Sequence, residues 1–322
     1  MQRLRVPKDR LGRFPARHHL GIDPQLTGIR ALEHRAVREW HHWLADRWLP
    51  EWPVLLITPC SNVKPYTRSP TSRKIAAVLR RLGLWRGGAP FGVEWLYLSD
   101  LLVLVPYVRA GEYPACCYEL HPEELLKDRE RYELIVGLLS DLIARKLWPH
   151  TVILFLPRRH LELWSEAYSR ARLKPRVVRV AYTIFSVRGL EEAVRAAVVE
   201  AARATRAVLE RGLGDDTCSM AVHRADGSYI EIRHPSDCSG EWCRQDARFA
   251  ETCLESLCRR LWLVDRFAGP LDPGRLPDRI RSFCVERGYL PAHAPRQVSL
   301  DEILPGNPAQ PRLEQPRNAH RG

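Results

Sequence analysis

The chain has 322 residues, 45% of them hydrophobic, and a formal net charge of +12. This length allows one sizeable hydrophobic core or two modest ones. Its apolar runs are far shorter than the roughly 18 residues that a membrane-spanning helix needs, and the basic N-terminus lacks the apolar core of a signal peptide. These features exclude a membrane-spanning protein and favour a soluble cytoplasmic one.

Arginine supplies nearly all of the positive charge, since only six of the 50 basic residues are lysines. A strong positive charge is typical of proteins that bind polyanions, so we expect a nucleic-acid partner. A basic proteome or a solvated surface is the alternative explanation. The sequence also has only three Asn and two Met residues, which points to a thermophilic source, to which genomic base composition can contribute.

The first elements along the chain are an irregular basic arm, a helix and a strand. Residues 1–25 have no steady hydrophobic period, whereas apolar residues recur at helical spacing from Thr27 and stop before Pro50. The next apolar run, residues 54–57, does not alternate with polar residues. Such a run is typical of a strand buried on both faces of a parallel sheet.

Strands and helices alternate over the following 160 residues. This alternation predicts an α/β fold with a mainly parallel three-layer sheet. Ligands of such sheets bind beyond the carboxyl ends of the strands. Both the segment Pro59 to Ser69 and the pair Ser99-Asp100 follow predicted strands, so we expect them at one rim of the sheet. The predicted strands are 93–98, 152–156 and 177–182, and the predicted helices are 72–84, 122–147, 159–173 and 190–213.

The sequence changes character after Gly214. A hairpin is predicted over 219–233 with its turn near Ala225, then a helix over 247–267, then a Pro-rich tail expected to be disordered from Pro305. We therefore divide the chain into a basic arm and helix (1–50), an α/β core (51–213), a small α+β extension (214–304) and a tail (305–322).

The extension is rich in cysteine and histidine but lacks a Cys-x2-Cys pair. A metal site, a disulfide such as Cys238 with Cys243, and free thiols are all open interpretations. The residues concerned are Cys218, His223, His234, Cys238, Cys243, Cys253 and Cys258.

Two sequence blocks carry a resemblance to a known family. The segment PCSNVKPYTRSPTS is similar to the archaeosine-synthase signature PC-x3-KPY-x2-S-x2-H. The later segments SDLLVLVPY and GEYPACCYEL resemble that family's second block, in which a Val-Pro run precedes Tyr-Pro-Ala and a Tyr-Asp pair. The resemblance covers roughly residues 51–175. The matching positions are Pro59, Cys60, Lys64, Pro65, Tyr66, Ser69, Val105, Pro106, Tyr113, Pro114, Ala115 and Tyr118.

The resemblance implies a core related to uracil-DNA-glycosylase-like folds and a tRNA-modifying reaction. In that reaction the side-chain amine of free lysine adds to the nitrile of 7-cyano-7-deazaguanine in tRNA, and a radical-SAM partner enzyme then cleaves the adduct to archaeosine. It implies no cofactor or metal for this chain itself. A homo-oligomer is compatible with this interpretation, and a membrane role is not expected.

This chain departs from the family pattern at several points. Ser72 stands where the family has His, and Glu119 follows Tyr118 where the family has Asp. The family's transglycosylase-like and RNA-binding PUA domains have no counterpart here. The departures leave two other functions open, a non-catalytic tRNA-binding subunit and a base-modifying enzyme acting on DNA or RNA.

Three residues of these blocks are predicted to be catalytic. A thiolate adds readily to an electrophilic nitrile, so Cys60 is a candidate nucleophile, and a buried packing role is its alternative. Lys64 either binds an anionic group or lowers the pKa of the Cys60 thiol. Asp100 either accepts the substrate ammonium or acts as a general base, with capping of the next segment as the alternative.

The other residues of the two blocks are predicted to contact the substrate. Tyr66 and Ser69 offer hydroxyl donors, and Tyr113 and Tyr118 offer rings on which a base can stack. Ordinary turn and packing roles are the alternatives for all of them. The full set predicted to bind substrate is Pro59, Ser61, Pro65, Tyr66, Ser69, Ser72, Tyr113, Tyr118 and Glu119.

Overall fold

The computed structural model describes residues 21–148, 150–183, 186–213, 217–223, 229–235, 247–271 and 278–291. Most of the predicted basic arm lies outside these residues. The turn near Ala225, the Cys238 and Cys243 pair, and the tail from Pro305 also lie outside them.

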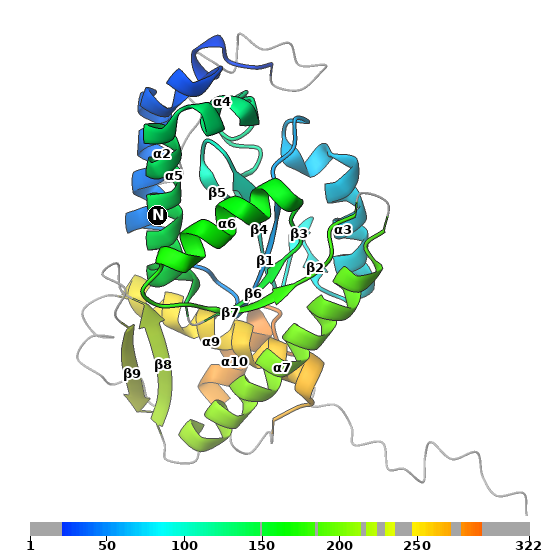
Figure 1. Cartoon of the computed structure of the whole chain (residues 1–322). Helices are drawn as coiled ribbons and strands as arrows, with labels where there is room; N and C mark the ends of the chain where they lie inside the picture. Colours follow the sequence, from blue (N-terminus) through cyan, green and yellow to red (C-terminus); the bar gives the residue numbers. More distant parts are fainter. Residues whose placement is uncertain are drawn as a thin grey trace, which may run out of the picture.

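The centre of the fold is a five-stranded sheet in the order β5-β4-β1-β6-β7 (Figure 1). Strands β4, β1, β6 and β7 are parallel, and β5 pairs antiparallel with β4 at one edge. The predicted α/β fold with a mainly parallel sheet is thereby confirmed. The strands are β1 (Val54–Pro59), β4 (Glu94–Ser99), β5 (Val103–Pro106), β6 (Thr151–Leu154) and β7 (Arg176–Arg179), and a short hairpin joins β2 (Trp85–Arg86) to β3 (Ala89–Pro90).

Helices cover both faces of this sheet. Helices α2, α5 and α6 lie on one face, and α3 and α7 lie on the other (Figure 1). The chain makes the β1–α3–β4 and β6–α6–β7 crossovers in opposite lateral directions, and right-handed crossovers then place their helices on opposite faces. The three predicted layers are thus present, while the likeness to uracil-DNA glycosylases stays a prediction. The helices are α2 (Arg35–Asp46), α3 (Pro70–Arg81), α4 (Pro122–Lys127), α5 (Arg129–Leu142), α6 (Arg158–Arg170) and α7 (Arg188–Leu213).

Two of the predicted helices are interrupted in the structure. The predicted helix 122–147 breaks at Asp128, whose carboxylate accepts a hydrogen bond from the backbone N–H of Arg131 and so starts α5 anew. Similarly, the Nδ1 atom of His34 accepts from the N–H of Ala36, so α2 begins there after a 3-10 turn. Both breaks have one cause, since a side-chain acceptor at an N-cap competes with the helical backbone bonds.

Strand β1 lies at the centre of the main core. Its residues from Val54 to Thr58 are all buried, as the uninterrupted apolar run predicted. It pairs with β4 on one side and β6 on the other, and helices cover both of its faces. The strand therefore holds the Cys60 segment, which follows it directly, in a rigid place.

We expect Leu56→Ala to lower the free energy of unfolding by about 2–5 kcal/mol. Leu56 is fully buried, so the substitution removes apolar contacts on a strand that cannot easily collapse around the cavity. Chemical denaturation measures the change. Leu126→Ala is the matched control, because the Leu126 side chain is 56% exposed and its loss should change stability by less than about 0.5 kcal/mol.

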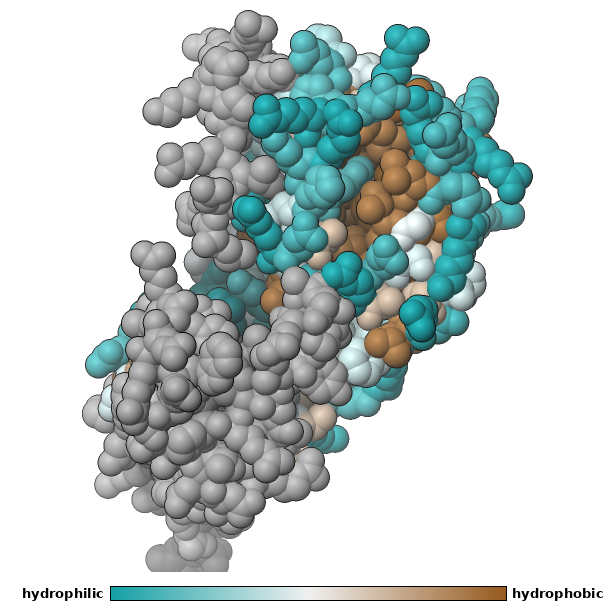
Figure 2. Space-filling view, turned by 90° about the vertical axis from the view of Figure 1, so that its left-hand side faces the viewer, coloured by the Kyte–Doolittle hydropathy of each residue, from teal (hydrophilic) through white to brown (hydrophobic). Residues whose placement is uncertain are grey.

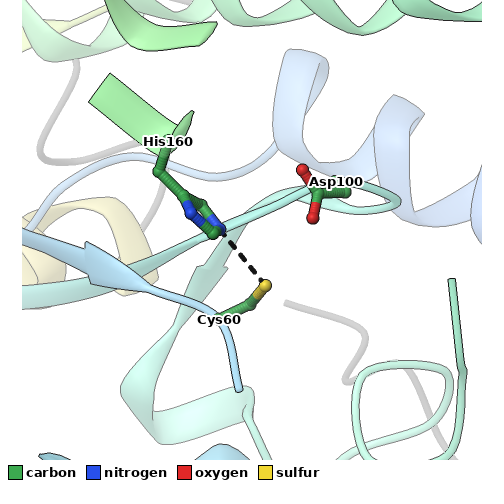
Figure 3. A group of neighbouring side chains, drawn as sticks. All are labelled: Cys60, Asp100 and His160. Atoms are coloured by element: carbon green, nitrogen blue, oxygen red, sulfur yellow. Dashed lines mark hydrogen bonds between the residues drawn. The ribbon is translucent and has the colours of Figure 1, made fainter. Parts of the chain in front are cut away.

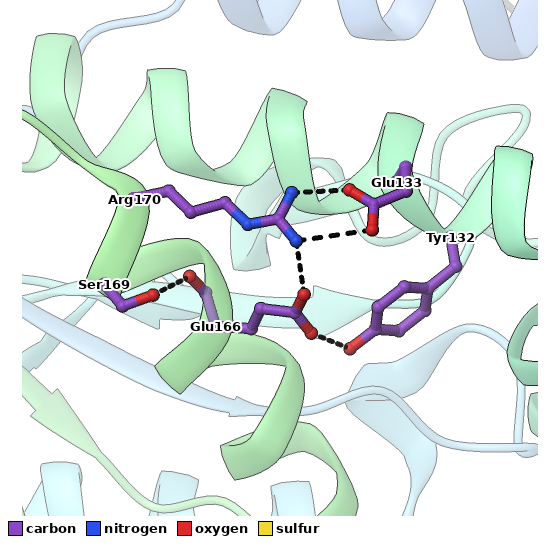
Figure 4. Close-up of polar contacts among 5 residues, drawn as sticks. All are labelled: Tyr132, Glu133, Glu166, Ser169 and Arg170. Carbon is purple, nitrogen blue, oxygen red and sulfur yellow. Dashed lines mark hydrogen bonds and ion pairs between the residues drawn. The ribbon is translucent and has the colours of Figure 1, made fainter.

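An ion-pair network ties α5 to α6 on the surface (Figure 4). Arg170 pairs with Glu133 of α5 and with Glu166 of its own helix. Tyr132 donates a hydrogen bond of 2.7 Å to Glu166. Burial, and to a lesser extent this bond, raise the pKa of Tyr132 to about 12. Because the charges are largely exposed, salt weakens them and packing remains the main tie between the helices.

The C-terminal extension contains a second, smaller apolar cluster. The predicted hairpin is present as antiparallel strands β8 (Thr217–His223) and β9 (Tyr229–Pro235), and helices α9 (Ala247–Ala268) and α10 (Asp278–Glu286) follow. Cys258 and Cys284 form a disulfide inside the cluster, so Cys258 is neither a metal ligand nor a free thiol. Among the described residues, no helix combines the length and apolar character of a membrane span.

Candidate active site

Three neighbouring strands deliver three chemically active side chains to one point. Cys60 follows β1, Asp100 follows β4, and His160 lies in the first turn of α6, after β6 (Figure 3). Their sulfur, carboxylate oxygen and imidazole nitrogen atoms all lie within 4.8 Å of one another. The chain direction across the sheet reverses between β1 and β6, which is where open α/β sheets bind ligands.

The contacts within this cluster fix the relative positions of its side chains. Cys60 Sγ lies 3.4 Å from His160 Nε2, a hydrogen-bond distance for sulfur. Asp100 pairs at 2.8 Å with the guanidinium of Arg159, the residue before His160. Asp100 and His160 are only 5% and 9% exposed, whereas Cys60 is half-buried. The thiol therefore lies against His160, beside a carboxylate that Arg159 already pairs.

The site favours the neutral forms of both the thiol and the imidazole. Burial, and then the negative charge of Asp100, raise the pKa of the Cys60 thiol to about 12. Burial lowers the pKa of His160, and the charge of Asp100 opposes this only in part. A neutral imidazole can accept a proton, and the Asp100 carboxylate stabilises the imidazolium that would form. The arrangement thus suits attack by the thiol with proton transfer to His160.

Lys64 lies in a buried aromatic setting beside the cluster. Its Nζ atom donates a 2.6 Å hydrogen bond to the carbonyl of Ser61 and lies 4.4 and 4.3 Å from the ring centres of Tyr66 and Tyr118. Burial lowers the pKa of Lys64, and the nearby groups Cys60, Asp100 and Glu119 counteract part of that shift. The ammonium is therefore a positive charge held close to the reactive sulfur.

Beneath Lys64, three buried hydroxyl groups form a chain. Tyr66 and Tyr118 share a hydrogen bond between their hydroxyls, and Tyr118 also bonds to Ser99 Oγ at 2.6 Å. Tyr118 is only 3% exposed, and one face of its ring meets the Lys64 ammonium. The ring of Tyr118 thus supports Lys64, and its stacking on a base stays a prediction.

Ser69 and Ser72 hold the loop onto the helix that follows it. Ser69 is the N-cap of α3, and its Oγ accepts a hydrogen bond from the N–H of Ser72 at 3.1 Å. The Ser72 hydroxyl in turn accepts from Ser69 at 2.9 Å and from Tyr97 at 3.1 Å. Both serines are buried and occupied in this network, so their contact with substrate stays a prediction.

The remaining predicted residues have varied positions. Tyr113 is buried, and its hydroxyl donates to Asp23 at 3.1 Å, so it ties the N-terminal segment down, and its contact with a base stays a prediction. Glu119 has an exposed side chain whose charge acts on Lys64. Pro59, Ser61 and Pro65 are half-buried in the loop that carries Cys60 and Lys64.

Two residues of the cluster, Arg159 and His160, were not among the predicted site residues. A signal for them existed, because they follow the third parallel strand just as Cys60 and Asp100 follow the first two. A lone His at a predicted helix start gives no other indication of its role. His160 comes close to Cys60 only because β6 pairs with β1, a pairing that the sequence does not show.

The same three side chains are also of the types that bind zinc. Two features oppose a dication at this point. The guanidinium of Arg159 already pairs with Asp100, and the Lys64 ammonium interacts with both Cys60 and Asp100. The donor set therefore fits an organic electrophile better than a metal ion.

Comparisons with known proteins identify no family for this chain. No family model and no curated protein matches the sequence. The crystal structure of AF0587, a protein of unknown function, aligns over 51% of this chain and 50% of its own length, with 19% sequence identity and a TM-score of 0.34. The aligned part thus spans about half of either protein.

Proposed function

We propose that this protein is a tRNA-modifying transferase that joins the side-chain amine of lysine to the nitrile of 7-cyano-7-deazaguanine in tRNA. One observation carries the proposal, namely the Cys60 thiol 3.4 Å from the imidazole of His160 at the rim of the sheet. Cys60 and Lys64 belong to the segment that resembles the archaeosine-synthase signature. A nitrile is the electrophile that such a thiol attacks readily.

The first chemical step forms a thioimidate. The Cys60 sulfur bonds to the nitrile carbon, its proton moves to His160, and the imidazolium then protonates the nitrile nitrogen. In the second step, the neutral amine of lysine attacks the same carbon, the carbon–sulfur bond breaks, and the proton lost by the amine returns to the thiol. The sum is nitrile plus amine to amidine, and it needs no oxidant or reductant.

The two charged residues beside the thiol have supporting roles in this proposal. The Lys64 ammonium stabilises negative charge as the sulfur gives up its proton. Asp100, held by Arg159, stabilises the protonated form of His160 through its charge. Ser72 replaces the family's His at the end of the signature, so His160 supplies the imidazole from a different element.

We infer the partners from the charge and from the signature. The net charge of +12 favours binding of the tRNA backbone, which fits a cytoplasmic enzyme. Free lysine is the co-substrate, and a radical-SAM enzyme takes over the amidine product. A homo-oligomer is compatible with these roles.

The raised pKa of Cys60 favours a second candidate function. A thiol that stays protonated is a poor nucleophile, as expected of a site without catalytic activity. In that case the chain is a non-catalytic tRNA-binding subunit of a modification complex. Binding and transfer can be measured separately, so the two functions are distinguishable.

A single-turnover assay tests the proposal. Purified protein is mixed with tRNA carrying 7-cyano-7-deazaguanine and with radiolabelled lysine, and label in the tRNA is counted. We expect transfer by the wild type and a loss of at least about a hundredfold in Lys64→Met. Tight, salt-sensitive tRNA binding without any transfer would reject the enzyme and favour the binding subunit. Treatment with a chelator should not change the rate.

A further inference from the structure

Apart from the Cys60 cluster, a pocket lies between helices α2 and α5. The space inside it that a water-sized molecule can occupy is small, about 40 Å³. Figure 2 views the molecule from the side on which α2 and α5 lie. The pocket walls are mostly apolar and come from Leu44, Ala45, Val103, Leu138 and Leu142.

Lys146 is the unusual residue of this pocket. Its side chain lines the pocket and is only 2% exposed. Its Nζ atom is buried and has no hydrogen-bond acceptor among the residues that the structure describes. Buried polar atoms are nearly always paired, and an unpaired buried cation is costly. A ligand can therefore provide the hydrogen-bond acceptor that the ammonium lacks.

The backbone explains why this lysine points inward. Lys146 lies in the π-helical turn Ile143–Leu147 that continues α5. Such turns widen a helix, change the direction of its side chains and occur often at functional sites. Without the π turn, a lysine so near the end of a surface helix would normally reach into solvent.

The surroundings of the ammonium restrict the kind of ligand. Arg145 also lines the pocket and adds positive charge. Asp141 in the pocket wall and Asp46 near Lys146 are negative, so they repel a ligand that carries more than one negative charge. A single negative charge therefore fits better than a dianion such as phosphate. His41 is already bonded through Nε2 to the carbonyl of Leu101 at 2.8 Å. The remaining wall is apolar and suits a short alkyl chain.

We propose that this pocket binds a small organic monocarboxylate, whose carboxylate pairs with the Lys146 ammonium and whose alkyl chain lies against the leucine wall. The ligand is a free small molecule, because the space open to it is small. Burial lowers the pKa of Lys146, and a bound carboxylate would raise it again. This site is separate from the Cys60 cluster and does not depend on the proposed transferase.

Ligand-observed NMR on the full chain tests the proposal with three probes of similar size. Saturation-transfer NMR signals are recorded for butyrate and for uncharged butanol. Binding of inorganic phosphate is measured by the shift in melting temperature. We expect butyrate to bind, butanol to bind at least about tenfold more weakly, and phosphate to leave the melting temperature unchanged relative to chloride.

Variants locate the binding. Lys146→Met keeps the volume and removes the charge, and it should weaken butyrate binding about tenfold or more. Lys127→Met, at an exposed lysine of α4, is the matched control and should bind like the wild type. Ala45→Phe fills the pocket from a half-buried position and should also abolish binding, which keeps the test decisive if Lys146→Met does not fold.

Two results would overturn the inference. One is a wild type that shows no butyrate signal, and the other is equal binding by the wild type, Lys146→Met and Ala45→Phe. Cys60→Ala should bind butyrate normally. If Cys60→Ala loses lysine transfer but still binds butyrate, the two sites are independent. Failure of the transferase proposal can then be told apart from failure of the pocket proposal.

Discussion

Replacing Cys60 with alanine is expected to reduce lysine transfer by at least about a thousandfold while leaving tRNA affinity unchanged. The alanine variant cannot form the thioimidate, and the half-buried position of Cys60 makes a folding defect small. Label transfer measures the rate, and filter binding measures the affinity. His160→Ala should reduce transfer by about a hundredfold or more, because the thiol then has no proton acceptor.

Intact-mass analysis provides a direct readout of the same prediction. Without lysine, the wild type should accumulate a covalent adduct with a 7-cyano-7-deazaguanine nucleoside, and Cys60→Ala should not. Cys117→Ala is the matched control, since Cys117 lies close enough to Lys64 to act on it but is buried. An adduct in the Cys60 variant, or full transfer activity without Cys60, would disprove the covalent route.

Alkylation of Cys60 is expected to be slow near neutral pH and to speed up as the pH rises toward 12. The reason is that the thiolate is the reactive form, and the pKa of Cys60 is raised to about 12 by burial and by the charge of Asp100. Asp100→Asn removes that charge, lowers the pKa and shifts the rate profile to lower pH. At a fixed pH of 8 we expect about a three- to tenfold faster reaction.

Peptide mapping after iodoacetamide treatment measures this rate at Cys60 alone. The control is Asp141→Asn, an exposed carboxylate of α5 that should leave the profile unchanged. If Asp100→Asn reacts more slowly than the wild type, Asp100 instead helps to ionise the thiol. That outcome would reverse the role that we assign to its charge.

Several parts of the fold could be predicted from the sequence because their signals are local. The uninterrupted apolar run 54–57 predicted a buried strand, and the alternation of strands and helices predicted a parallel sheet. Side-chain caps were harder to predict, since Asp128 and His34 break or start helices through single hydrogen bonds. The apolar pattern continues through such positions and does not show the break.

The candidate site was predictable only in part for a similar reason. The sequence by itself determined that Cys60 and Asp100 follow strands and so lie at one rim. Only the tertiary structure decided that β6 is next to β1, which brings His160 to within 3.4 Å of the thiol. The tertiary structure likewise placed Tyr118 under Lys64, and it buried Lys146 with no acceptor in the part of the chain that it describes. Such contacts join residues up to a hundred positions apart, and hydrophobic periodicity carries no information about them.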